Sequence, residues 1–88
     1  MDTETSIRRR KLKFRAWHRG TREMDLLMGR FADAHLDAFG ADQLDRFEAL
    51  LGESDPDIYD WVTGRQAPSA DQASDVVELL RRFSNQAE

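Results

Sequence analysis

A chain of 88 residues makes one small domain, which buries roughly 60% of the surface of its unfolded form and leaves little room for an enclosed active site. The chain has no cysteine and only two histidines, His18 and His35, which excludes disulfide bonds and argues against a zinc centre. No apolar run is long enough for a membrane span or a secretory signal, so we expect a soluble protein that works through its surface.

The net charge of −4 is distributed unevenly along the chain. Residues 1–22 hold eight of the 13 Lys and Arg side chains and two acidic ones, whereas the rest of the chain holds five basic and 15 acidic side chains. Such polarity orients an approaching partner. An Arg-rich start is also typical of a mitochondrial presequence, but Asp2 and Glu4 are unusual there, so we interpret the segment as an integral helix.

Hydrophobic periodicity predicts helices throughout and no strand, which indicates an all-α fold. The first helix is expected at about residues 7–18, after six residues that fray. Its apolar stripe of Ile7, Phe14 and Trp17 is narrow and interrupted by basic side chains. We therefore expect this helix to dock weakly by one edge, with most of its surface in water.

The second helix, expected at residues 21–38 and ended by Gly40, has the clearest buried stripe. The stripe consists of Met24, Leu27, Met28, Phe31 and His35. The third helix, expected at residues 41–51, is closed by Gly52 as a left-handed residue. Its buried side chains are predicted to be Leu44, Phe47, Leu50 and Leu51.

The fourth helix is short and starts at residues 54–57, where Asp55 is expected to cap it and Pro56 to occupy its first position. Its inward residues are Ile58, Trp61 and Val62, and Gly64 ends it. The fifth helix is expected to begin with residues 69–72, a capping box of Ser69 and Gln72. Its inward residues are Ala73, Val76, Val77, Leu80 and Phe83.

Short connections between these helices favour antiparallel neighbours. We therefore expect a compact five-helix bundle that forms a single domain over residues 1–88, with fraying at 1–6 and 84–88. The second, third and fifth helices should supply most of the core.

The most informative stretch is Arg19-Gly20-Thr21-Arg22-Glu23-Met24-Asp25, where a basic helix gives way to an apolar one. Gly20 can take backbone angles that cost other residues energy, so it suits the end of the first helix. Glu23 then falls in the first turn of the next helix, where a negative charge is favourable. A glycine break flanked by charges is hard to explain by packing alone.

No side chain of the chain carries the marks of a catalytic centre. No Ser or Lys nucleophile has a recognisable base beside it, and we interpret His35 as a core-edge residue. His18 either complements the dipole of the first helix or contacts a partner. A group of carboxylates in the fourth helix fits capping better than cation binding. These are Asp55, Asp57 and Asp60. We predict no catalytic, cofactor-binding or metal-binding residues.

Two other functional classes are compatible with the residues. The basic run at 8–15, with Phe14 and Trp17 available for stacking, suggests nucleic-acid binding. The acidic remainder should repel a polyanion, and no nucleic-acid-binding motif is evident. A general protein-interaction adaptor is the third possibility.

The chain resembles the succinate dehydrogenase assembly factor 2 family, whose bacterial members are called SdhE, over about residues 7–83. The R-G-x-x-E signature, followed by an acidic residue two positions on, stands at residues 19–25. A second signature, D-P-D-hydrophobic-x-x-W, stands at residues 55–61. Both patterns at this spacing in a short helical chain are specific.

The resemblance implies a five-helix fold and a role in attaching FAD covalently to a histidine of the flavoprotein subunit of succinate dehydrogenase, and often of fumarate reductase. It implies that the bond-forming chemistry belongs to that subunit. The chain would then be a transient, non-catalytic chaperone that binds no cofactor permanently, no nucleic acid and no membrane. With no presequence before the first helix, a bacterial cytoplasm is expected, rather than a mitochondrial matrix.

The resemblance places the partner contact at the corner between the first two helices. It supports Arg19, Gly20 and Glu23 most directly, and Asp25 is either a contact or a favourable first-turn charge. The predicted partner-binding residues are Trp17, His18, Arg19, Gly20, Arg22, Glu23 and Asp25. The two arginines of the motif suit either the FAD diphosphate or carboxylates of the partner, of which we favour the carboxylates. The second signature is better explained by architecture.

Overall fold

A computed structural model of the chain describes residues 3–86. These residues form five α-helices and one 3-10 turn and include no strand, which confirms the all-α class. The chain divides at Leu44 into two compact units, which are described in turn. The single-domain boundary stays a prediction, and the fraying expected at residues 1–2 and 87–88 falls outside the described residues.

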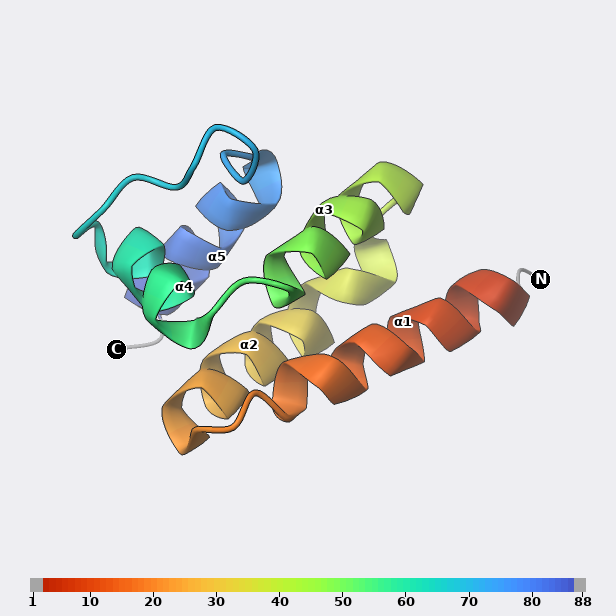
Figure 1. Ribbon diagram of the computed structural model, residues 1–88. Coiled ribbons are helices and arrows are strands. Elements are labelled where there is room, and N and C mark those ends of the chain that lie inside the picture. Colours follow the sequence, from red (N-terminus) through yellow and green to blue (C-terminus); the bar gives the residue numbers. More distant parts are fainter. Residues whose placement is uncertain (1–2, 87–88) are drawn as a thin grey trace. The chain divides into compact units, whose positions relative to one another are not determined.

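The first unit is built on an antiparallel pair of helices. Helix α1 (Thr3–Trp17) and helix α2 (Arg22–His35) lie side by side and are joined by a tight corner (Figure 1). A 3-10 turn, η1 (Leu36–Ala38), continues α2. Helix α1 begins at Thr3, four residues before the expected start at Ile7.

The face by which α1 packs differs from the predicted one. Its buried residues are Leu12 and Ala16, whereas Ile7 and Phe14 are 43% and 64% exposed. The prediction was wrong for Ile7 and Phe14 and missed Leu12 and Ala16, whereas Trp17, the third residue of the predicted stripe, is half-buried against α2.

Helix α2 buries most of its predicted stripe. Its buried residues are Met24, Met28, Gly29, Phe31 and Ala32. Leu27 and His35, also predicted there, are half-buried. Gly40 was expected to end this helix, but it instead directly precedes the next one. Its N–H donates to Gln43 Oε1 at 3.2 Å, and its carbonyl accepts from Leu44 N at 3.0 Å.

Helix α3 (Ala41–Leu51) has the predicted bounds and crosses from the first unit into the second. All four predicted core residues are buried: Leu44, Phe47, Leu50 and Leu51. Gly52 follows the helix without the expected left-handed backbone, because positive φ angles in residues 3–86 occur only at Gly20 and Gly64.

Helix α4 (Asp55–Thr63) is capped by Ser54, whose hydroxyl accepts from Asp57 N at 3.3 Å. Asp55 is thus the first helical residue and not the cap, and Pro56 follows it at a position where no backbone donor is needed. The inward side chains are the predicted Ile58, Trp61 and Val62. Gly64 ends the helix, as predicted, and it does so in the left-handed conformation, with φ of 79°.

Helix α5 (Asp75–Gln86) begins later than expected, and it lies beside α4 (Figure 1). The predicted capping box does not form, because the Gln72 side chain donates to Glu53 Oε1 at 3.1 Å. Ser74 caps the helix by accepting from Val77 N at 3.3 Å. Its buried residues are Val76, Val77 and Leu80, as many as α4 provides.

Candidate functional site

The corner between α1 and α2, residues 17–25, contains the R-G-x-x-E motif. Helix α1 ends at Trp17, and Gly20 then adopts φ of +117°, which side chains with a Cβ rarely adopt. A Cβ at Gly20 would meet no atom within 4 Å. The motif therefore needs glycine for its backbone angle, and the space above the glycine is open to a partner.

The corner is held by polar groups of α2. The Asp25 carboxylate oxygen Oδ1 accepts hydrogen bonds from the backbone N–H of Arg19 and, at 3.2 Å, from that of Gly20. Thr21 caps the helix, with Oγ1 accepting from Met24 N at 3.3 Å. To the two roles predicted for Asp25 the structure thus adds a third, which is to fix the backbone of the corner.

Trp17 packs the end of α1 against α2. Its indole lies directly over Gly29, where a Cβ would fall 2.1 Å from Cδ2, and its Nε1 donates to Asp33 Oδ2 at 3.2 Å. Trp17 was predicted both in the apolar stripe of the first helix and among the partner-binding residues, whereas no role was predicted for Gly29 or Asp33. These contacts join residues that lie 12 and 16 positions apart, so no local spacing rule could have found them.

His18 stacks on Phe14, with ring centroids 4.0 Å apart. Its Nδ1 lies 2.6 Å from the Phe14 carbonyl oxygen. Because a carbonyl only accepts, Nδ1 carries a proton and donates it. This hydrogen bond satisfies a carbonyl near the C-terminus of α1, and the exposed ring still faces solvent.

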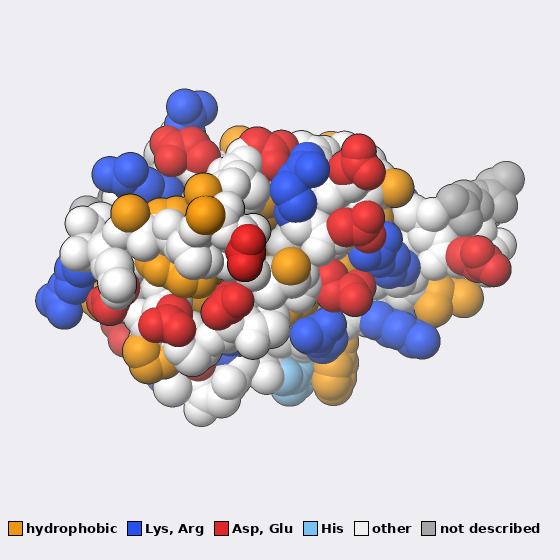
Figure 2. Space-filling view, turned by 45° about the horizontal axis from the view of Figure 1, so that its top comes forward, with side chains coloured by type: hydrophobic (Ala, Val, Ile, Leu, Met, Phe, Trp, Pro, Cys, Tyr) orange, Lys and Arg blue, Asp and Glu red, His pale blue; other side chains and the backbone are white. Residues whose placement is uncertain are grey.

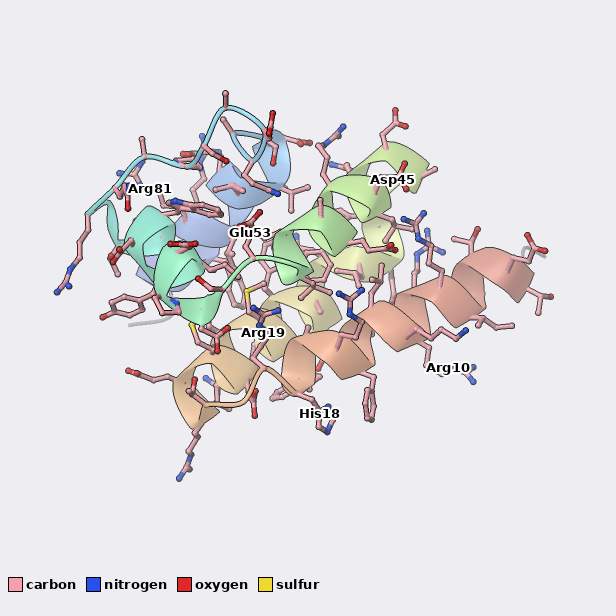
Figure 3. All side chains as sticks on the ribbon, viewed as in Figure 1. Arg10, His18, Arg19, Asp45, Glu53 and Arg81 are labelled. Atoms are coloured by element: carbon pink, nitrogen blue, oxygen red, sulfur yellow. The ribbon has the colours of Figure 1, made fainter. Side chains whose placement is uncertain are left out.

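The charged residues of the motif differ in how far folding engages them. Arg19 is half-buried and His18 is exposed, and Figure 3 shows their side chains leaving the corner in different directions. Arg22 and Glu23 are exposed in the first turn of α2. Neither side chain makes a hydrogen bond or ion pair within residues 3–86.

An open hollow of about 510 Å³ lies over the corner. Five of the seven predicted site residues line it: Trp17, His18, Gly20, Arg22 and Asp25. Arg19 and Glu23 are outside this lining. The corner therefore combines an indole edge, a histidine, an arginine and a carboxylate around an exposed glycine backbone.

The basic run of α1 is partly consumed by folding. Arg9 donates from Nε and Nη2 to the carbonyl oxygens of Leu36 and Phe39, both at 2.9 Å, and so fastens η1 to α1. Lys13 pairs with Asp37 at 3.1 Å. Basic and acidic side chains are interspersed on the face drawn in Figure 2.

Residues 3–86 were also compared with the requirements of a metal site and of a membrane-spanning helix. No group of three His, Asp or Glu side chains there is arranged to hold a metal ion. No helix in that range is both long and apolar enough to cross a membrane.

Residues 10–84 match the family model described as "Flavinator of succinate dehydrogenase". The chain is 43% identical to the FAD assembly factor SdhE of Acetobacter pasteurianus over 89% of its own length and 69% of that protein. It is 37% identical to the mitochondrial succinate dehydrogenase assembly factor 2 of Meyerozyma guilliermondii, over 82% of this chain and 56% of the relative.

A further mitochondrial assembly factor 2, from Candida glabrata, is 36% identical over 92% of this chain and 56% of its own length. The chain thus spans little more than half the length of these two yeast relatives. Assembly factors are non-catalytic maturation factors, so the similarity agrees with the prediction that the chain is not an enzyme.

Proposed function

We propose, from the premise that the chain belongs to the family of succinate dehydrogenase flavinators, that it binds the flavoprotein subunit of succinate dehydrogenase and promotes covalent attachment of FAD to that subunit. The observation that carries the proposal is the arrangement of residues at the corner. There the motif sets out an open glycine backbone beside Arg22 and Glu23, two exposed charges that folding leaves without a side-chain partner in residues 3–86.

The contact with the partner follows from this geometry. A partner backbone can approach Gly20 closely, because no side chain stands above it. Arg22 and Glu23 then offer one cation and one anion for charge-assisted hydrogen bonds of opposite polarity, which fix the orientation of the partner. Asp25 keeps the corner in shape before binding, so little conformational entropy is lost on association.

The factor acts by binding one state of the flavoprotein better than another. A ligand shifts a conformational equilibrium only by its difference in affinity for the two states. The chain therefore favours the arrangement in which FAD and the accepting side chain of the subunit meet. Its heterodimer with the flavoprotein is transient, and the chain dissociates after FAD is attached.

FAD is the cargo of the partner and not a ligand of the corner. The hollow at the corner contains a carboxylate, Asp25, beside Arg22, and a carboxylate repels a diphosphate. A single carboxylate or an amide of the flavoprotein meets less repulsion from Asp25 than a diphosphate does, which supports contact of the motif with such groups of the partner. A fumarate reductase flavoprotein is a further proposed client of the same surface.

A nucleic-acid partner is not proposed, because Arg9 and Lys13 of the basic run are engaged within the fold. We place the protein in a bacterial cytoplasm, since the relative with 43% identity is the bacterial factor, while the yeast relatives are named as mitochondrial.

Co-expression tests the function of the whole chain. A succinate dehydrogenase flavoprotein subunit is produced with and without the chain at equal FAD supply, and covalent flavin is read as fluorescence of the denatured subunit on a gel. The proposal predicts more covalent flavin per subunit when the chain is present. Equal fluorescence with the cognate subunit would contradict it.

A further inference from the structure

The side of α1 that faces away from its buried face carries large apolar side chains. Ile7 and Phe14 are 43% and 64% exposed, while the buried Leu12 lies on the opposite side of the helix. At 3.6 residues per turn, Lys11 falls in the same stripe, and His18 extends it beyond the helix end. We call Ile7, Lys11, Phe14 and His18 the outer strip.

The side chains at the centre of the outer strip are arranged by contacts within the chain. The Phe14 and His18 rings are stacked with an interplanar angle of 20°, and the histidine Nδ1 is tied to the Phe14 carbonyl. Two aromatic side chains held in one arrangement lose little rotamer freedom on binding. Exposed, preorganised aromatic side chains are the kind of residue that dominates binding energy at protein interfaces.

The edges of the outer strip are positively charged. Arg10 and Arg15 flank it, and both are exposed without an ion pair in the described part of the chain. Figure 3 shows the side chains of Arg10 and His18 leaving α1 on the same side. An apolar centre with cationic edges fits a protein surface that presents an apolar patch bordered by carboxylates.

The outer strip is continuous with the corner, because His18 belongs to both: it stacks on Phe14 and lines the hollow over Gly20. From Ile7 to His18 the strip extends for about 16 Å at the helical rise of about 1.5 Å per residue. A standard-size specific interface covers about 800 Å² on each partner and a transient one somewhat less, and a corner of a few residues provides only part of either. An adjoining surface is therefore needed.

We propose that the outer strip is a second contact surface for the flavoprotein that binds the corner, and that this partner covers Phe14 with an apolar patch edged by Asp or Glu. The inference rests on the proposed function and extends the same interface along α1. Phe14 supplies the anchor, while Lys11, Arg10 and Arg15 supply the salt-dependent part of the attraction.

The test measures the dissociation constant of the purified full chain with the flavoprotein subunit by calorimetry. Phe14→Ala is compared with Tyr59→Ala, which removes an aromatic side chain that is 41% exposed on α4. Alanine favours helix in both places, so neither change weakens the helix that carries it. We expect Phe14→Ala to weaken binding by at least about tenfold and Tyr59→Ala to leave it within about twofold.

A corner variant separates the two proposals. If Glu23→Gln weakens binding while Phe14→Ala does not, the outer strip is no contact surface and the proposed function stands. If the wild-type chain does not bind the flavoprotein, the proposed function fails and the inference fails with it. Circular dichroism of each variant verifies its helix content.

Other occupants of the outer strip are tested with the same variant. Sedimentation with vesicles of phosphatidylglycerol and phosphatidylcholine measures binding to an anionic lipid surface, and sedimentation equilibrium measures self-association. Loss of vesicle binding or of a dimer in Phe14→Ala, with unchanged affinity for the flavoprotein, would overturn the inference. Unaltered behaviour in both assays, together with weakened flavoprotein binding, would support it.

Discussion

The corner at residues 17–25 and the start of α4 at residues 54–62 each carry a short motif that stands out in the sequence, and folding treats them differently. At α4, the polar residues start the helix, and the Trp61 indole is buried at 8% exposure. At the corner, Asp25 and Thr21 are likewise used by the fold, but Arg22 and Glu23 extend into solvent.

The difference teaches that rarity of a motif does not reveal its purpose. Capping, a helix-starting proline and a buried indole fully account for the α4 motif. The same accounting at the corner explains Gly20, Asp25 and Thr21. It leaves Arg22 and Glu23 without a side-chain partner in residues 3–86, and it accounts for Glu23 only as a favourable first-turn charge. We propose that these two charges belong to the recognition surface.

The largest effect on stability is expected at the α4 motif. Trp61→Ala should lower the free energy of unfolding by about 3–5 kcal/mol, because it leaves a cavity where a buried indole stood. Urea unfolding followed by circular dichroism measures this, with the exposed Tyr59→Ala on the same helix as control. Equal midpoints for the two variants would remove the architectural explanation of the motif.

Within the corner, Trp17 and Gly29 should behave as one packing unit. Gly29→Ala is expected to cost about 1–3 kcal/mol, since the new Cβ collides with the indole. In a Trp17→Ala background the same change should cost nothing and should stabilise α2 by up to about 1 kcal/mol through helix propensity. An equal loss of stability from Gly29→Ala with and without the Trp17 side chain would show that the indole is not what excludes a Cβ at position 29.

Gly20→Ala isolates the backbone requirement of the motif. The site has room for a methyl group, so the expected loss of about 1–2 kcal/mol comes from the φ of +117° alone. Thermal unfolding compares it with Gly52→Ala, at a glycine of ordinary φ whose added Cβ would lie 3.3 Å from the Ala49 carbonyl oxygen. A larger loss at Gly52 would contradict the assignment of strain to the corner.

A smaller effect is expected at Asp25, the residue that fixes the corner. Asp25→Asn keeps an acceptor oxygen but removes the charge that strengthens two hydrogen bonds to backbone N–H groups, at a cost of about 1 kcal/mol. Hydrogen exchange of the Arg19 and Gly20 amides should accelerate in this variant. Unaltered exchange would mean that the carboxylate does not hold the corner.

Much of the fold was predictable because apolar periodicity is read directly from the sequence. It gave the bounds of α3 and the inward residues of α4 correctly. It failed for α1, where bulky Phe14 is exposed and small Ala16 is buried. Leu12 and Ala16 lie four residues apart on the buried side, and so sparse an apolar pattern did not distinguish that side from the one that carries Ile7 and Phe14.

Capping was harder to predict, since several candidate residues compete at each helix start. Ser54 and Ser74 cap α4 and α5 in place of the expected Asp55 and Ser69. At the corner, the need for glycine at position 20 was predictable from the motif, and its φ confirms it. The bracing by Asp25 spans five and six residues, outside the local patterns from which caps are read.

The most direct test of the central claim compares Glu23→Gln with Asp42→Asn, an exposed acidic residue in the first turn of α3. Both variants lose a similar helix-dipole contribution, so each should unfold within about 1 kcal/mol of the wild-type chain. The initial rate of covalent flavin formation is then measured with purified flavoprotein subunit, FAD and each variant. The account predicts a drop of about tenfold or more for Glu23→Gln and an unchanged rate for Asp42→Asn, because only Glu23 loses a charge-assisted contact with the partner. Equal rates for the two variants would contradict it.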